Sequence, residues 1–315
     1  MDLNLPILDK LAGCRSVLVA GMGGGFDVFC GLPLAFALQR RGVQVHLANY
    51  SFADIANFPA ATRLTTTLIG VEASDARLVV YFPELHLATW LAEQGRPQPV
   101  WCFQKTGFVP LLRDYRALVA HLAVDALLLV DGGVDSLMRG DEAAPGTLIE
   151  DSLSLAVAAQ LDDIPVRLVA CVGLGAEQEV AYRLVFENIA ALAAEGAFLG
   201  ACALTREMQV YQEYEAALLH AQAQPFQDPS VINSSIVSAV RGEYGNYHLT
   251  AKTHNSRLWI SPLMALYWFF DLMPMARRNL ILDSLDTSAT FMDAVRAVTS
   301  LRRTMQLRKS GQVPL

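Results

Sequence analysis

Residues 16–50 carry the clearest fold signal and read SVLVAGMGGGFDVFCGLPLAFALQRRGVQVHLANY. The first six residues are apolar and rich in valine, which is typical of a buried strand. A glycine-rich loop follows, and residues 28–42 then carry apolar side chains at helical spacing until Gly42. Residues 43–50 form a second strand-like run. This order predicts two parallel strands that are joined by a helix in a right-handed crossover.

The same alternation of strand and helix continues to about residue 205. Residues 77–82, 99–104, 125–133 and 166–175 are predicted strands, and residues 83–95, 107–124 and 147–161 are predicted helices. Thr147 and Glu150 have the spacing of a capping box at the start of the last of these helices.

After residue 205 the sequence no longer alternates between strand-like and helical segments. Residues 206–223 and 230–242 are predicted helices, residues 246–263 are polar and rich in turn formers, and the last 40 residues are mainly helical. The aromatic run 266–275 is expected in a core or an interface. We therefore predict an α/β fold in one domain over residues 1–315, with a doubly wound, mostly parallel sheet and helices on both faces. Its core would span 1–205, and 206–315 would form a mainly helical elaboration.

Composition restricts the class of protein. Of 315 residues, 53 % are apolar and 17 % are charged, and the mean hydropathy is +0.32. Disordered chains are more polar than this. The longest apolar stretch, residues 258–276, is interrupted by Asp271 and two prolines, so no membrane span is expected. No basic segment precedes the first apolar residues, and we expect a cytoplasmic protein whose apolar residues fill a large core or a homo-oligomer interface.

Charge and cysteine content exclude further classes. The net charge of −7 argues against nucleic acid as a partner, since nucleic-acid binding relies on excess lysine and arginine. The five cysteines form no CxxC pair and are odd in number, which favours buried thiols over a metal site or a disulfide framework. The expected partner is a small molecule.

The loop GMGGGFD, residues 21–27, is the first candidate ligand site. The glycines at 21, 23, 24 and 25 would let backbone N–H groups approach a phosphate or carboxylate at the start of a helix. A dinucleotide fingerprint would need glycine where Phe26 stands and an acidic residue where Asn49 ends the next strand, so NAD is a less favoured cofactor. Asp27 would repel an anion unless a cation lies between them. It either binds a metal, an amine or a hydroxyl group, or only stabilises its helix.

The segment VDGGVDSLMRGDE, residues 130–142, is the second candidate. It places four carboxylates after the most apolar strand, at an edge where α/β proteins bind ligands. A cluster of this kind favours Mg²⁺ or another divalent cation, or general acid–base chemistry by a carboxyl group with a raised pKa. A solvated acidic loop is the alternative. The candidate metal ligands are Asp131, Asp135, Asp141 and Glu142, and Gly132 and Gly133 would allow close approach of a ligand.

Three further groups of residues complete the candidate site. Gly173 and Gly175 follow another predicted strand on the same sheet edge and would bind ligand, and Glu177 could join them or simply start a helix. Lys252 is a candidate ligand-binding cation in an otherwise acidic chain. His254, together with Asp131 and Asp135, is a candidate catalytic residue.

The motifs GMGGGFD, LLLVDGGVDSLMRGDE and GTLIEDSLSLA together resemble the family catalogued as domain of unknown function 1152. The similarity extends over most of the chain and includes SPLMALYWFFDL near the C-terminus. The resemblance implies a Rossmann-like α/β fold and brings no activity with it.

From the chemistry of the residues we predict a hydrolytic or group-transfer enzyme. It would act on a nucleotide-like or phosphorylated small molecule held at the glycine loop, with the aspartates binding a divalent cation or transferring protons. Two alternatives remain: a non-catalytic nucleotide or metabolite sensor or assembly protein, and a modifying enzyme whose cationic or peptide substrate meets the carboxylates directly.

Overall fold

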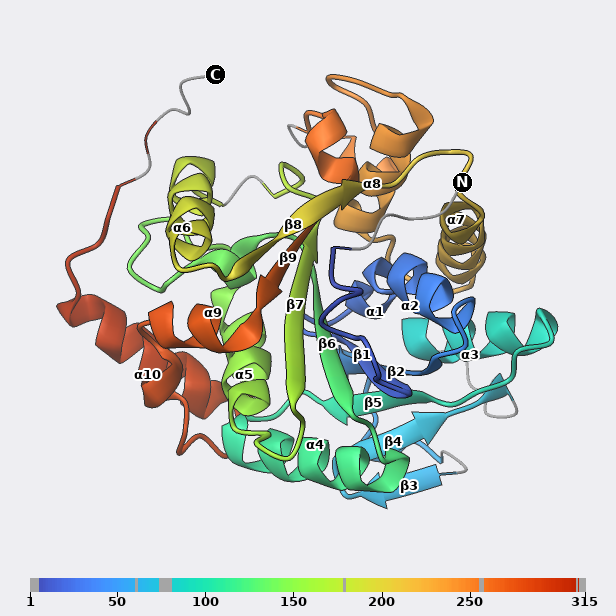
Figure 1. Ribbon diagram of the computed structural model, residues 1–315, viewed down its shortest axis with the longest axis horizontal. Helices are drawn as coiled ribbons and strands as arrows, with labels where there is room; N and C mark the ends of the chain where they lie inside the picture. Colours follow the sequence, from blue (N-terminus) through green and yellow to red (C-terminus); the bar gives the residue numbers. More distant parts are fainter. Residues whose placement is uncertain are drawn as a thin grey trace.

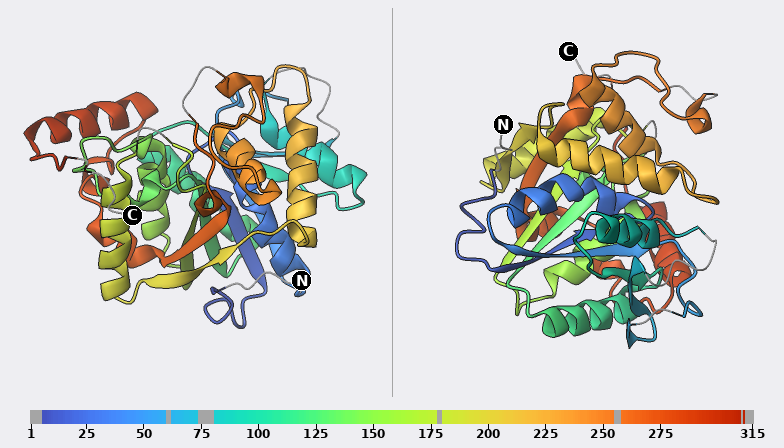
Figure 2. Two further views of the ribbon diagram at one scale, coloured as in Figure 1. Left: turned by 90° about the horizontal axis from the view of Figure 1, so that it is seen from above. Right: turned by 90° about the vertical axis from the view of Figure 1, so that its right-hand side faces the viewer.

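A computed structural model describes residues 6–59, 62–73, 81–177, 180–254, 258–309 and 311. These residues form a mixed α/β structure in which one nine-stranded sheet is covered by helices on both faces (Figures 1 and 2). The strand predicted at residues 77–82 lies mostly outside the described residues. Within the described part of the chain, no helix has the length and the apolar character needed to span a membrane.

The middle of the sheet is parallel, as predicted from the alternation of strands and helices. Its five strands are β5 (Val100–Gln104), β2 (Gln44–Ser51), β1 (Ser16–Gly21), β6 (Ala126–Gly132) and β7 (Val166–Val172), in that spatial order. Each pairs in parallel with its neighbour. Their side chains are almost wholly buried, because helices cover both faces.

Antiparallel strands extend the sheet at both ends. The hairpin β3 (Thr62–Thr65) and β4 (Leu68–Val71) continues from β5, whereas β9 (Leu266–Asp271) and β8 (Phe198–Ala203) continue from β7. The strand β9 is the aromatic run LYWFFD, and it lies between β7 and β8. The sheet is therefore not confined to the first 205 residues, because the C-terminal segment returns to it and supplies an inner strand.

Helices cover each face of the sheet in two separate apolar layers. Successive strand residues point to opposite faces, so Val17 and Val19 belong to one hydrophobic cluster, and Leu18 and Ala20 belong to the other. The first cluster includes residues of α1 (Asp27–Cys30), α2 (Leu32–Gln39), α3 (Pro83–Glu93), α7 (Gln209–Gln222) and α8 (Val231–Arg241). The second includes residues of α4 (Phe108–Leu122), α5 (Leu148–Ala159), α6 (Tyr182–Ala194), α9 (Leu272–Arg278) and α10 (Phe291–Thr304).

Short 3₁₀ turns lie between the main elements, at Asp135–Leu137, Ala251–Thr253, Pro262–Ala265 and Leu282–Ser284. The first of them follows β6 directly and carries part of the acidic segment.

The order of the strands determines where a ligand can bind. The chain leaves β1 toward β2 on one side and returns to β6 on the other side of β1. The connection after β1 leads to β2, and the connection after β6 leads to β7 on the opposite side. Because these two connections diverge at the carboxyl ends of β1 and β6, they leave a crevice between them. The glycine loop follows β1, and Asp131 lies near the end of β6, so both predicted motifs meet at this point.

Candidate metal and ligand site

The glycine loop brings its own carboxylate back against its backbone. Asp27 Oδ2 accepts a hydrogen bond of 2.7 Å from the N–H of Gly23. A Cβ atom on Gly23 would lie 2.7 Å from that oxygen and 2.8 Å from Oδ1 of Asp151, which is too close for any side chain. Gly24 has a φ of +98°, a backbone conformation that favours glycine. The loop therefore needs glycine both for its turn and for the approach of two carboxylates.

Asp131 and Asp135 are held in place by neighbouring polar groups. Asp131 Oδ2 accepts hydrogen bonds from the Ser136 N–H at 3.1 Å and from Ser136 Oγ at 2.5 Å. Asp135 Oδ2 accepts hydrogen bonds from the Thr147 N–H at 2.7 Å and from Thr147 Oγ1 at 2.6 Å. Each carboxylate has one oxygen fixed in this way, and both side chains are at most 2 % exposed.

The predicted capping box at Thr147 and Glu150 is wrong. Thr147 is the N-cap residue of α5, but its side chain makes no capping hydrogen bond, because the hydroxyl donates to Asp135 instead. The Glu150 carboxylate forms an ion pair of 2.8 Å with Lys105 rather than closing back on the N-cap. Thr147 thus orients a carboxylate of the site instead of capping its helix.

Asp151 and Glu177 complete the acidic group from two further elements. Asp151 lies in the first turn of α5, is 1 % exposed, and its Oδ1 has no hydrogen-bond partner among the described residues. Oxygens of Asp27, Asp131 and Asp151 all lie within 4.8 Å of one another. Glu177 lies in the loop after β7, and its Oε2 accepts a hydrogen bond of 3.2 Å from the Val134 N–H. The side chains come from four separate segments, which only the fold brings together.

Glycines beside these carboxylates leave them room. A Cβ on Gly132 would lie 2.7 Å from Asp27 Oδ1, and one on Gly133 would lie 2.6 Å from Glu177 Oε2. At Gly146, a Cβ would lie 2.8 Å from Asp135 Oδ2. The backbone is thus packed directly against the acidic side chains.

Burial and mutual repulsion raise the pKa values of four carboxyl groups of the site, those of Asp27, Asp131, Asp151 and Glu177. Burial is the main cause of the rise in the pKa of Asp27 to about 7, and repulsion from Asp135 and Glu150 adds to it. The pKa values of Asp131, Asp151 and Glu177 also lie well above their usual range, because the groups are buried beside one another. The group therefore retains protons near neutral pH or takes up positive charge from a bound cation.

A cavity of about 410 Å³ opens onto these carboxylates. We call it the acidic cavity. Among the described residues that line it, Lys252 is the one cation, and its Nζ pairs with Asp228 at 2.7 Å. The N-terminus of α8 forms one wall. The lining residues are Gly23, Gly24, Gly25, Phe26, Asp27, Phe52, Tyr81, Asp131, Gly132, Asp135, Thr147, Asp151, Glu177, Asp228, Pro229, Ser230, Val231, Ile232 and Lys252.

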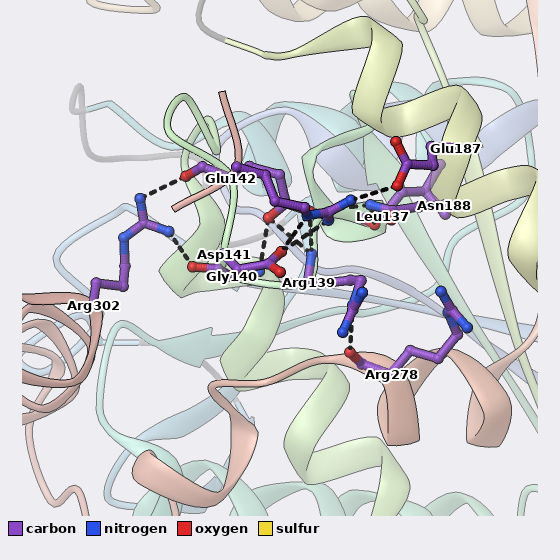
Figure 3. A network of polar contacts seen from close by, with 10 residues as sticks. Leu137, Arg139, Gly140, Asp141, Glu142, Glu187, Asn188, Arg278 and Arg302 are labelled. Atoms are coloured by element: carbon purple, nitrogen blue, oxygen red, sulfur yellow. Dashed lines mark hydrogen bonds and ion pairs between the residues drawn. The ribbon is translucent and has the colours of Figure 1, made fainter. Parts of the chain in front are cut away.

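The structure places Asp141 and Glu142 away from this cavity, contrary to their predicted role as metal ligands. Arg308 pairs with both carboxylates at 2.8 Å. Figure 3 shows the surrounding contacts, in which Glu142 also accepts hydrogen bonds from the N–H groups of Arg139 and Gly140 and from the Asn188 amide. We call this group the arginine network. Arginine and backbone donors already bind the carboxylates of Asp141 and Glu142. These two residues are therefore no longer candidate metal ligands.

Other predicted residues also lie outside the cavity. His254 is exposed and contacts the ring of His248 rather than the carboxylates. Gly173 and Gly175 have positive φ angles in the turn after β7, and a Cβ on Gly173 would lie 2.8 Å from Ile232 of α8. Gly173 thus lets α8 pack closely, whereas a Cβ on Gly175 would lie 3.3 Å from the Met264 side chain. Gly21 is buried beneath the loop, where a Cβ would lie 2.2 Å from Asn49 Oδ1.

The sequence alone does not identify several residues of the site. Asp151 and Glu177 stand near the predicted motifs, but their sequence spacing alone does not show that they converge with Asp27. Phe52 and Tyr81 also line the cavity without any motif to mark them. The position of Phe52 directly after β2, at the ligand-binding edge of the sheet, is the signal that could have identified it.

Comparison with known proteins identifies the family of this chain. A search of curated proteins and a search of solved structures returned no match. The model of the family described as "Protein of unknown function (DUF1152)" matches residues 91–307, which is more than half of the chain and includes Asp131, Asp135, Asp151 and Glu177. The chain therefore belongs to the DUF1152 family.

Proposed function

We propose that this protein is a hydrolytic or group-transfer enzyme that acts on a phosphorylated small molecule with the help of a divalent cation. The cation would bind Asp27, Asp131 and Asp151. The observation that carries this proposal is the convergence of oxygens from these three side chains within 4.8 Å of one another, at the carboxyl ends of two adjacent parallel strands.

The geometry and the charge of the acidic cavity support a cation. Mg²⁺ and Ca²⁺ bind oxygen ligands at about 2.0–2.6 Å, so three oxygens within 4.8 Å of one another need only small side-chain shifts to contact one ion. Asp151 Oδ1 is buried without a described partner, and such an atom costs free energy unless a ligand satisfies it. Because Lys252, the one cation among the described lining residues, already pairs with Asp228, the described residues give these carboxylates no counter-charge of their own.

The same cavity has groups suited to an anion next to the cation. The Gly24–Gly25 backbone and the first residues of α8, Val231 and Ile232, line the same cavity as the carboxylates. Helix N-termini and glycine-rich loops bind phosphate through backbone N–H groups. A cation between Asp27 and the phosphate would remove the repulsion between them. Asp135 or Glu177, which lie beside the proposed ligands, would then accept a proton from an attacking water or hydroxyl group.

We further infer that the fold is of the Rossmann-like, doubly wound type. The support is the β1–α1–α2–β2 unit with its two parallel strands, the parallel centre of the sheet and the position of the glycine loop at the point where strand order reverses. Asn49 lies near the end of β2, where a ribose-binding acid would stand in a dinucleotide site, and its amide donates to Gly25 O and Glu84. We therefore do not propose NAD as the cofactor.

Calorimetric titration with Mg²⁺ and Mn²⁺ tests the cation site. We expect the wild-type protein to bind one cation and the Asp151→Asn variant to bind it at least about tenfold more weakly. Asp162→Asn is the matched control, because this aspartate side chain is 89 % exposed and lies outside the cavity. Phosphate release from a panel of phosphate esters, with and without the cation, then tests turnover. Equal cation affinity in wild type and Asp151→Asn contradicts the proposal.

The two alternative roles give different results in the same experiments. A sensor would bind phosphorylated ligands with Mg²⁺ and release them unchanged. An enzyme for cationic substrates would bind a small diamine without any metal ion, through the carboxylates themselves, and would lose this binding in Asp151→Asn.

A further inference from the structure

One wall of the acidic cavity is aromatic, and the proposed cation chemistry does not use it. Phe52 follows β2 and Tyr81 precedes α3, and both line the cavity beside the glycine loop. The Phe52 side chain is 43 % exposed, although most large apolar side chains of this protein are fully buried. An exposed ring inside a concave site requires an explanation beyond core packing.

The ring of Phe52 is fixed from two directions. A Cβ on Gly24 would lie 2.2–2.7 Å from three ring atoms, so the absence of a side chain at Gly24 allows the ring to pack directly on the loop. Lys105 Nζ lies 4.3 Å from the centroid of Phe52 and 4.0 Å from that of Phe291, and it pairs with Glu150. These contacts hold the ring at the rim without burying it, which limits the entropy cost of stacking a ligand on it.

Tyr81 extends the aromatic surface along the loop. Its hydroxyl oxygen would lie 3.4 Å from a Cβ on Gly25. Burial, together with the nearby Glu84, Asp228 and Asp27, raises its pKa, so the hydroxyl stays protonated and able to donate a hydrogen bond. The cavity thus combines a carboxylate floor, a backbone suited to phosphate, and an aromatic rim with one polar donor.

We propose that Phe52, with Tyr81 beside it, is the stacking platform for a planar aromatic part of the substrate. The substrate class is then a nucleoside phosphate rather than a sugar phosphate: the phosphate lies at the glycine loop and the base lies on Phe52. The inference rests on the proposed function, since it takes the phosphate position from it. The cavity volume of about 410 Å³ falls in the range of small-molecule sites.

Calorimetry at saturating Mg²⁺ tests the platform by comparing the four common ribonucleoside 5′-monophosphates with ribose 5-phosphate. We expect at least one nucleotide to bind wild-type protein about tenfold more tightly than the sugar phosphate, in line with base–aromatic stacking elsewhere. Phe52→Leu should abolish this preference and leave the affinity for ribose 5-phosphate unchanged. Phe52→Tyr, which keeps a ring, should retain it. Tyr244→Leu is the matched control, because Tyr244 is 69 % exposed and lies outside the cavity.

Three results overturn the platform: nucleotides that bind no more tightly than ribose 5-phosphate, nucleotides that do not bind at all, or a Phe52→Leu variant that weakens both ligand types equally. The Mg²⁺ titration without nucleotide separates this failure from that of the proposed function. If Mg²⁺ binds through Asp151 but Phe52→Leu has no selective effect, the metal site stands and the platform is wrong. If the nucleotide preference depends on Phe52 while no cation binds, the platform stands and the metal site is wrong.

Discussion

The acidic cavity and the arginine network both contain carboxylates from residues 130–142, but the partners of these carboxylates differ. Asp141 and Glu142 meet Arg308, and Glu142 also accepts backbone and amide hydrogen bonds. Asp27, Asp131 and Asp151 meet one another, and no described arginine or lysine pairs with any of them. Identical residue types, about ten residues apart, therefore serve as a structural link in one place and as a candidate binding site in the other.

This difference shows that the number of acidic residues in a segment is a poor guide to function. A buried carboxylate that is paired with an arginine is costly to disrupt, whereas a buried group of carboxylates without a positively charged partner destabilises the fold unless a cation binds. The two regions should therefore respond in opposite directions when one charge is removed.

Loss of the arginine should produce the largest effect. Arg308→Ala removes the partner of Asp141, Glu142 and Glu187 and leaves Glu142, which is 0 % exposed, without its cation. Breaking a buried pair from one side costs about 3 kcal/mol or more. Urea unfolding should show a loss of this order. Arg303→Ala, which removes an exposed arginine on α10, should change the free energy of unfolding by less than about 0.5 kcal/mol. Similar values for the two variants would mean that the network contributes little.

Replacing one carboxylate by its amide in each region should change the free energy of unfolding in opposite directions. Glu142→Gln places an NH₂ group against donors from Arg139, Gly140 and Asn188, so it should lower the free energy of unfolding by about 2 kcal/mol. Asp151→Asn removes repulsion and breaks no described hydrogen bond of Oδ1, so the metal-free protein should be equally stable or more stable by about 1 kcal/mol. Thermal unfolding in the presence of a chelator measures both. A destabilised Asp151→Asn protein would show that the acidic cavity is satisfied without a cation.

Stability of the metal-free protein should depend on pH through the acidic cavity. The pKa of Asp27 is raised to about 7 in the folded state, against an ordinary value near 4 in the unfolded chain. The folded protein therefore binds more protons between about pH 4 and 7, and the contribution of Asp27 to stability falls as pH rises through this window. The slope is about 1.4 kcal/mol per pH unit for one group. Urea unfolding at a series of pH values should show a shallower slope in Asp27→Asn than in wild type.

The affinity for Mg²⁺ should change with pH in the opposite direction to the stability of the metal-free protein, because protons and cations compete for the same oxygens. Mg²⁺ affinity should rise between pH 5 and 8 in wild type. A cation affinity that does not change with pH would separate metal binding from these carboxylates.

The sequence was sufficient to predict the centre of the sheet. The strands β1, β2, β6 and β7 are short apolar runs bounded by glycine or polar residues, and this pattern is local. The meeting of the glycine loop with Asp131 also follows from a general rule about parallel sheets. By contrast, the position of β9 between β7 and β8 depends on pairing with strands about 60 to 100 residues earlier in the chain. An apolar run indicates burial but does not identify its neighbours.

The set of residues that form the site was harder to predict, because it also depends on contacts between residues far apart in the sequence. Asp141 and Glu142 look like ligands because they stand beside Asp135 in the sequence, yet Arg308, far along the chain, neutralises them. Glu177 comes from a different strand end and reaches the site only through the fold. Counter-charges are long-range features, so a single sequence identifies acidic residues without showing which of them are paired.

Thr147 allows the smallest and most specific test of the comparison. Thr290 at the start of α10 has the same sequence spacing to an acidic residue and does form a capping box, with Asp293. Thr147→Val keeps the backbone N–H bond to Asp135 but loses the hydroxyl bond that orients this carboxylate beside the proposed cation ligands. We therefore expect modestly weaker Mg²⁺ binding and a stability change within about 1 kcal/mol. Thr290→Val should remove about 1 kcal/mol of stability and leave Mg²⁺ affinity unchanged, because its hydroxyl caps a helix. Calorimetry and thermal unfolding of both variants, with Thr147→Ser as the control that restores the hydroxyl, distinguish the two uses of one sequence pattern. If Thr147→Val lowers stability as Thr290→Val does and leaves Mg²⁺ affinity intact, the hydroxyl of Thr147 supports α5 rather than the site.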